Sequence, residues 1–176
     1  MLKTKLCELM ESNSYVSIYK DRDDLSAFGF GLVIACNDEH LVFASFSPRG
    51  ENDGFQLAEV NSIHKIEYDD PYASNMKRLI QYYGSTHEAC HFQQNFIVEL
   101  LEHSKEKAFL VIIEICNSNH FDAIGMVDSI DDDGCKILLI DQYGKEAGYA
   151  EIRYSDITQI YSDDCDERYR RILYQM

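Results

Sequence analysis

Short apolar segments alternate with polar turns along the first half of the chain. Leu2, Leu6, Leu9 and Met10 recur at helical spacing, which predicts a short opening helix over residues 1–10. Alternating or β-rich segments then predict five strands, at residues 15–19, 28–36, 41–46, 55–60 and 63–68. In the second of these strands, we expect one face to consist of Phe28, Phe30, Leu32, Ile34 and Cys36.

A helix is predicted directly after the fifth strand. Asp70 is a good N-cap, Pro71 suits the first helical position, and Gly84 suits the C-terminal end. The apolar residues within it recur at i, i+4, i+7, i+8 and i+11 and are Tyr72, Met76, Leu79, Ile80 and Tyr83. This spacing predicts one buried helix face.

The second half of the chain follows the same plan. A helix is expected over residues 86–104, where Ser85-Thr86-His87-Glu88 fits a capping box. Five strands are expected at residues 109–115, 123–130, 135–141, 149–154 and 157–161. A last helix is predicted from Asp164, with Glu167 completing a capping box. Its buried side is expected to carry Tyr169, Ile172, Leu173 and Met176.

The two halves match at a separation of 94 residues. The segment at 63–70 recurs at 157–164, and the ungapped match extends to glycine and apolar pairs: Gly31 with Gly125, Gly50 with Gly144, and Ile18 with Ile112. Such a duplication predicts two domains, residues 1–84 and 85–176, each with N- and C-terminal helices. We expect a mainly β fold, because five short antiparallel strands bury their faces best in a small closed barrel.

The spacing of particular residue types within each half resembles that of the Sm-like family (the Sm, LSm and Hfq proteins), a variety of SH3-like barrel. The first Sm motif is matched in the second half by Gly125, Val127, Asp131 and Leu138, and in the first half by Gly31 and Val33. The second motif is echoed by Ile152-Arg153 and Ile157. The resemblance implies two fused Sm-like five-stranded barrels.

The family binds RNA bases through residues that this chain largely replaces. The family's Asn position holds Leu41 and Cys135, and its second-motif Gly position holds Val60 and Tyr154. Only Arg153 retains the family's residue type. The resemblance therefore implies the fold, and it leaves RNA binding as an alternative function.

Charge and composition narrow the classes of partner. The formal net charge of the 176 residues is −15, made up of −5 in residues 1–84 and −10 in residues 85–176. This balance disfavours DNA, nonspecific RNA binding and anionic membrane surfaces. Residues 1–10 lack the apolar core of a signal peptide, and six scattered cysteines without a C-x-x-C spacing suit reduced thiols. We expect a cytoplasmic protein.

Residues 87–91, His87-Glu88-Ala89-Cys90-His91, fit the H-E-x-x-H pattern. On a helix, this spacing would place two imidazoles together to bind zinc, with Glu88 as the general base of a hydrolase. The same residues begin the helix predicted over 86–104, so a capping role explains Glu88 as well. We prefer the structural interpretation and expect neither a catalytic residue nor a cofactor.

Three functional hypotheses follow. The first is a non-enzymatic binding or regulatory protein whose partner is another protein, as a monomeric pseudo-dimer or a homodimer. The second is an RNA-associated regulator. Its candidate ligand-binding residues are Lys136, Arg153, Arg168, Arg170 and Arg171. The third is the zinc hydrolase with His87 and His91.

Overall fold

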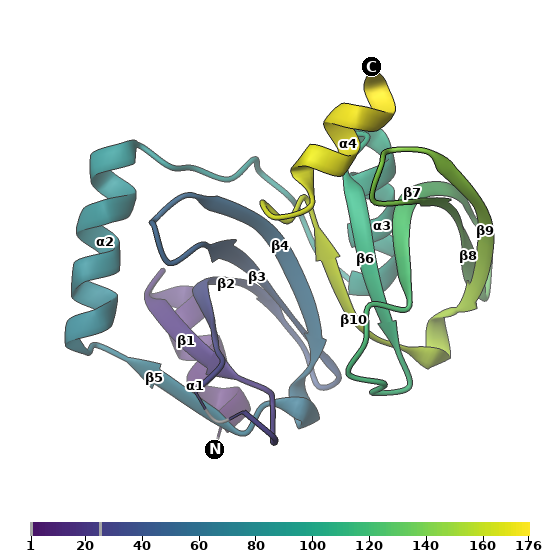
Figure 1. Ribbon diagram of the computed structural model, residues 1–176. Helices are drawn as coiled ribbons and strands as arrows, with labels where there is room; N and C mark the ends of the chain where they lie inside the picture. The colour runs from purple at the N-terminus through teal and green to yellow at the C-terminus, as the bar shows by residue number, and fades with distance from the viewer. Residues whose placement is uncertain (1, 25) are drawn as a thin grey trace. The chain divides into compact units, whose positions relative to one another are not determined.

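The computed structural model describes residues 2–24 and 26–176, so the first residue of the predicted opening helix lies outside the described residues. The chain divides into two compact units at Ala89 and Cys90. We call the part up to Ala89 unit 1 and the part from Cys90 unit 2. Each unit is built from antiparallel strands with helices, as Figure 1 shows.

Unit 1 contains five strands in the order β5-β1-β2-β3-β4. Its elements are α1 (Leu2–Glu11), β1 (Tyr15–Tyr19), β2 (Gly29–Cys36), β3 (His40–Phe46), β4 (Asn52–Glu59), the 3-10 helix η1 (Val60–Ser62), β5 (Lys65–Tyr68) and α2 (Pro71–Tyr83). The five strands lie where the hydrophobic pattern placed them, within a few residues. A mainly β architecture with flanking helices is therefore confirmed.

Unit 2 has the corresponding order β10-β6-β7-β8-β9. Its elements are α3 (Phe96–Glu106), β6 (Leu110–Ile115), β7 (Ala123–Ile130), β8 (Gly134–Ile140), β9 (Glu146–Arg153), the 3-10 helix η2 (Tyr154–Asp156), β10 (Ile157–Ser162) and α4 (Arg168–Gln175). Among the described residues, no helix is long and apolar enough to span a membrane.

The strand registers of the two units correspond closely. Gly31 pairs with Ser45 in unit 1, and Gly125 pairs with Leu139 in unit 2. The residue numbers of each corresponding position therefore differ by 94. The first strand departs from this offset by one residue. Ile18 is opposite Gly29, whereas Ile113 is opposite Ala123, so the predicted match of Ile18 with Ile112 is wrong. Unit 1 has one extra residue between its first two strands.

The predicted face of the second strand is also wrong in part. Phe30 is buried, but Ile34 and Cys36 are only partly so, whereas Val33 and Ala35 are buried. The register shifts between Val33 and Ala35, as expected for a β-bulge. Phe30 belongs to an apolar cluster with α2 and Val33 to another with α1, so both faces of the strand are covered and the buried residues do not follow one period-two face.

The described residues of unit 1 form two apolar clusters. One is formed by α1 and the sheet and contains Leu6, Leu9, Val16, Ile18, Val33, Leu41, Phe43 and Ile63. The other lies under α2 and contains Phe30, Phe46, Ala73, Met76 and Ile80. As predicted, Asp70 caps α2 by accepting a hydrogen bond from the amide of Ala73, and Gly84 ends it with φ +63°. The second cluster therefore holds α2 by apolar burial.

The helix predicted over residues 86–104 begins ten residues late. Asn95 is the actual N-cap of α3, with its side chain accepting from the amide of Val98 at 3.3 Å. Glu99 accepts from the amides of Gln93 and Gln94 at 2.9 and 3.0 Å. These bonds satisfy the amides of Gln93 and Gln94 just before the helix, so Asn95 and Glu99 together define where it starts.

The last helix also differs from its prediction. It begins at Arg168, Glu167 makes no side-chain cap, and no residue of α4 is buried. The predicted buried face is exposed at Ile172 and Leu173. At the 94-residue offset, the buried residues of α2 correspond to Glu167, Arg170 and Tyr174. Charged side chains at these positions cannot be buried without partners, so α4 does not form an apolar contact like that of α2.

Candidate functional site

Unit 1 has an aromatic pocket of about 290 Å³. Its aromatic lining comes from the end of the β1–β2 connection, β2, β3 and α2 and consists of Phe28, Phe30, Phe46 and Tyr72. Its polar lining consists of Ser26, Ser45, Asp53 and Gln56. We call this site the aromatic pocket. Its volume is at the lower end of the range for ligand sites, which suits one side chain or a small molecule.

The rings of the aromatic pocket are arranged around Tyr72. The centre of the Tyr72 ring lies 5.2 Å from that of Phe28 and 5.3 Å from that of Phe30, and its plane is nearly perpendicular to both rings. Phe30 is 3% exposed, whereas Phe28 and Tyr72 are 38% and 36% exposed. The Phe30 ring is therefore held by the residues packed around it, while the Phe28 and Tyr72 rings remain accessible at the mouth of the pocket.

Buried polar groups lie among these rings. The Gln56 amide donates to the Ser45 hydroxyl at 3.1 Å, and both residues are buried. Gly29 lines the pocket beside them, and a Cβ there would be 3.4 Å from Gln56 Oε1 and 2.9 Å from the Phe43 ring. A side chain at position 29 would therefore crowd the pocket, and glycine leaves the Gln56 oxygen within reach of a ligand.

Negative charge adjoins the aromatic pocket. Asp53 lines it, and among its described lining residues there is no Lys or Arg. Burial, with a smaller contribution from the carboxylate of Asp70, raises the pKa of Tyr72 above its ordinary value of 10.0. The Tyr72 phenol is therefore neutral at pH 7. Outside the lining, the Lys20 ammonium lies 5.9 Å from the centre of the Phe43 ring. Within the described lining, the carboxylate of Asp53 favours a cation over an anion.

Unit 2 lacks these aromatic residues at the corresponding positions. At the 94-residue offset, Phe28, Phe30, Phe46 and Tyr72 are replaced by Asp122, Ile124, Ile140 and Asp166. The strand registers support this correspondence, because Phe46 is opposite Asn52 and Ile140 is opposite Glu146. The aromatic pocket is thus a difference between two units whose strands pair alike.

The predicted ligand-binding residues Lys136 and Arg153 line one hollow of about 370 Å³ on β8 and β9. Its acidic lining residues are Asp131, Asp133 and Glu151. Lys136 Nζ lies 3.5 Å from an Asp128 oxygen and 4.1 Å from the centre of the Tyr149 ring. Arg153 Nε donates to Asp156 at 3.0 Å. Both cations are therefore balanced by carboxylates of unit 2, which weakens their attraction for phosphate.

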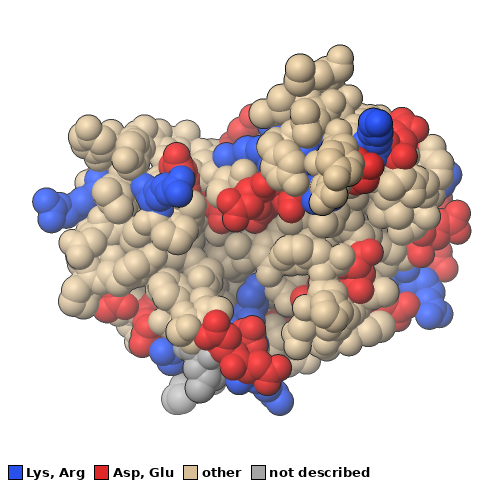
Figure 2. All heavy atoms as spheres, in the orientation of Figure 1, with Lys and Arg blue, Asp and Glu red and all other residues tan. Residues whose placement is uncertain are grey.

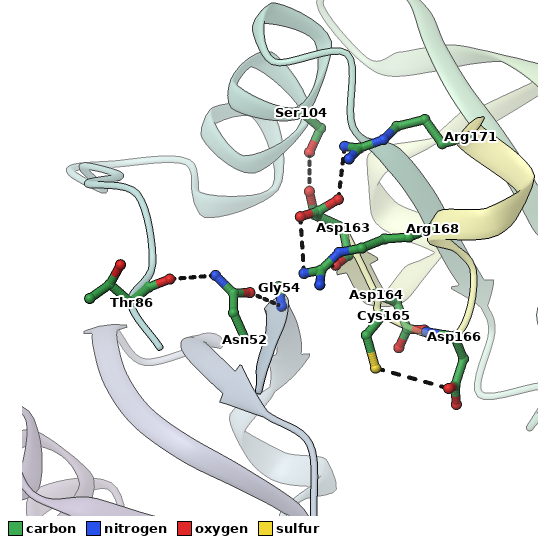
Figure 3. A network of polar contacts seen from close by, with 11 residues as sticks. Asn52, Gly54, Thr86, Ser104, Asp163, Asp164, Cys165, Asp166, Arg168 and Arg171 are labelled. Atoms are coloured by element: carbon green, nitrogen blue, oxygen red, sulfur yellow. Dashed lines mark hydrogen bonds and ion pairs between the residues drawn. The ribbon is translucent and has the colours of Figure 1, made fainter. Parts of the chain in front are cut away.

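The three arginines of α4 are also paired within unit 2. Arg168 and Arg171 contact the two oxygens of Asp163 at 3.1 and 2.8 Å, and Figure 3 shows them converging on that carboxylate. Arg170 contacts Glu167 at 2.7 Å. Figure 2 shows, on its visible face and for the residues described, basic side chains interspersed with acidic ones. We call Asp163, Arg168 and Arg171 the arginine clasp.

Residues 87–91 are not helical, so the predicted placement of His87 and His91 on one helix face is wrong. The His87 ring instead packs on Phe46 at 4.6 Å and on Phe55 at 5.4 Å. The neighbouring Thr86 carbonyl accepts a hydrogen bond from the Asn52 amide at 2.6 Å (Figure 3). Within the described residues, no group of three or more His, Cys, Asp or Glu side chains is arranged to bind a metal ion.

Sequence reasoning missed the aromatic pocket, although it assigned three of its rings to a strand face and a helix face. Asp53 precedes the strand predicted at 55–60 and Gln56 is a polar position within it, so neither was singled out, although both lie in β4. The available signal was the difference between the two halves of the sequence, since Phe28 and Tyr72 correspond to Asp122 and Asp166 at the 94-residue offset. Comparison with protein-family models, characterised proteins and solved structures finds no match to this chain.

Proposed function

We propose that the chain is a non-enzymatic binding protein made of two duplicated Sm-like units, and that its partner is a protein with a basic segment. The aromatic pocket is the observation that carries this proposal. It combines accessible rings with an acidic lining residue, in a chain whose net charge is −15. Exposed aromatic residues are typical anchors of protein interfaces, and opposite charge speeds and orients association.

The strand orders and registers support the Sm-like part of the proposal. β5 lies next to β1 in unit 1, and β10 lies next to β6 in unit 2, so the last strand of each unit pairs with its first. The short helices η1 and η2 occupy the same place between the last two strands. A five-stranded antiparallel sheet can close into a small barrel.

The ion pairs favour a protein partner over RNA. Arg153, Arg168, Arg170 and Arg171 all contact carboxylates within unit 2. Binding a phosphate there requires breaking a pair or bringing the phosphate close to an acidic group. A basic peptide meets no such cost on an acidic surface.

The proposal is tested by measuring the binding of short labelled peptides to the full chain by fluorescence anisotropy. Arginine-rich, glutamate-rich and uncharged peptides of equal length are compared with a uridine-rich RNA oligonucleotide at about 50 mM salt, where screening is weak. We expect only the basic peptide to bind, and more weakly at about 300 mM salt. Equal binding of the three peptides, no peptide binding, or tighter binding of the RNA contradicts the proposal.

A further inference from the structure

The aromatic pocket is built for a particular cation. Its rings come from the β1–β2 connection, β2, β3 and α2, and its acidic residue and buried amide both come from β4, yet they surround one space of about 290 Å³. We propose that the aromatic pocket binds the side chain of an arginine presented by the partner. This inference deepens the proposed function and rests on it.

Aromatic faces at the mouth supply the first part of the recognition. Phe28 and Tyr72 are each more than one-third exposed, and the Phe28 ring is tilted by 35° to that of Tyr19 and lies at 84° to that of Tyr72. A cation next to such faces is attracted by the negative charge above the ring plane. A planar guanidinium can also stack on a ring, which an ammonium group cannot do.

Hydrogen-bond acceptors supply the second part and distinguish arginine from methylated lysine. Asp53 lines the pocket, and buried Gln56 places its amide oxygen beside Gly29. A guanidinium carries five N–H donors that can reach such acceptors. A trimethylammonium group has no N–H donor and cannot hydrogen-bond to either oxygen. The polar groups therefore favour arginine.

The comparison of the two units supplies the third part. At the positions of Phe28 and Tyr72, unit 2 has Asp122 and Asp166. Asp122 has a structural role there, accepting hydrogen bonds from the Ile115 amide at 2.9 Å and from the Ser118 hydroxyl. In unit 2, the carboxylate of Asp122 thus stabilises the loop before β7. At the corresponding place in unit 1, aromatic rings surround an open space.

The test follows aromatic and backbone NMR signals of the full chain during titration with three small probes. These are N-acetyl-arginine amide, its neutral isostere N-acetyl-citrulline amide, and N-acetyl-trimethyllysine amide. We expect arginine to shift signals of Phe28, Phe30 and Tyr72, with at least about threefold weaker binding of the other two probes. Equal or tighter binding of citrulline overturns the role of the charge, and tighter binding of trimethyllysine overturns the guanidinium assignment.

Variants place the binding in the pocket. Tyr72→Ala is expected to abolish the shifts, and the milder Asp53→Asn to weaken arginine binding about threefold while keeping the fold. Tyr143→Ala, at a tyrosine of unit 2 that is 67% exposed, is the matched control and should change nothing. Unchanged binding by Asp53→Asn and Tyr72→Ala overturns the pocket assignment.

The two proposals fail in different ways. If the arginine-rich peptide binds the wild-type chain and both pocket variants equally, the partner is basic but uses another surface. If no basic peptide binds the wild-type chain, the proposed function itself fails. Circular dichroism of each variant confirms that a loss of binding is not a loss of folding.

Discussion

Single residues at matching positions give the two units different chemistry. Phe28 is half-exposed beside the aromatic pocket, and its counterpart Asp122 accepts two hydrogen bonds that hold the loop at residues 116–122. That loop contains Cys116, Asn117 and Asn119 with positive φ angles of 53°, 52° and 57°. Asn adopts such conformations more readily than other residues that carry a Cβ, so Cys116 is the least favourable of the three, and the hydrogen bonds to Asp122 stabilise the loop around it.

The first prediction is that Asp122 makes the stability of unit 2 depend on pH. The Ser118 hydroxyl, followed by the Ile115 amide, lowers the pKa of Asp122 below its ordinary value of 3.8. A lowered pKa in the folded state means that this stabilisation is present above about pH 4 and is lost as the pH falls through the folded pKa. Asp122→Asn retains an acceptor but does not titrate. Urea unfolding at about pH 6 and about pH 3 should therefore show a smaller drop for the variant.

An equal drop for the variant and the wild-type chain would contradict this role of Asp122. Asp132→Asn is the control, because the same kind of substitution is made in an exposed turn of unit 2. It should leave the pH dependence as it is in the wild type. The comparison separates the hydrogen-bonded carboxylate from the general effect of removing one negative charge.

At the scale of elements, the sequence predicted the strands well and two helix starts poorly. Strands depend on local alternation and on turns, both of which are visible in the sequence. The sequence offers one cap at Ser85 and another at Asn95, and α3 begins after Asn95, whose side chain accepts from the amide of Val98. The exposure of α4 depended on Glu167 and Arg170, which interrupt the apolar face.

The candidate site was less predictable than the fold, for a related reason. The sequence showed that arginines cluster at 168–171, but not that Asp163 and Glu167 neutralise them. The aromatic pocket joins residues as distant in sequence as Phe28 and Tyr72, whose rings lie 5.2 Å apart. Without the strand order, neither their proximity nor the burial of Gln56 between strands can be inferred from the residues alone.

The second prediction is that salt loosens α4 and leaves α2 unchanged. The arginine clasp holds α4 through half-buried ion pairs worth on the order of 1 kcal/mol, whereas α2 buries Met76 and Ile80. Hydrogen exchange at residues 168–176 should speed up several-fold at about 1 M salt, since the screening length falls to about 3 Å. Asp163→Asn should have the same effect at low salt.

Met76→Ala is the matched test for α2. Removing this side chain, which is 2% exposed, should cost about 2–4 kcal/mol at any salt concentration. Exchange in residues 71–83 should rise with it, while α4 remains protected at low salt. Salt-sensitive hydrogen exchange in α2 would show that apolar burial alone does not hold α2. Salt-insensitive exchange in α4 would show that the arginine clasp does not hold α4.

At the scale of the whole molecule, the duplication yields two similar frameworks with one specialised site. The registers of β2 with β3 and of β7 with β8 correspond at a constant offset, and both units have a glycine at the turn under the last helix, Gly50 and Gly144. A Cβ at these glycines would lie 2.8 Å from Leu79 and 2.4 Å from Leu173. The strand framework is thus shared, and the lining of the aromatic pocket is the part that differs.

The third prediction is a stoichiometry of one arginine site per chain. If the strand framework itself created the site, both units would bind arginine, and a peptide with two arginines could bind more tightly by contacting two sites. Because Asp122 and Asp166 replace Phe28 and Tyr72, we expect titration calorimetry with an arginine-containing peptide to give one peptide per chain. Tyr72→Ala should then abolish the binding heat altogether. A stoichiometry of two, or half of the binding heat left in Tyr72→Ala, would mean that unit 2 binds arginine through a surface unlike the aromatic pocket.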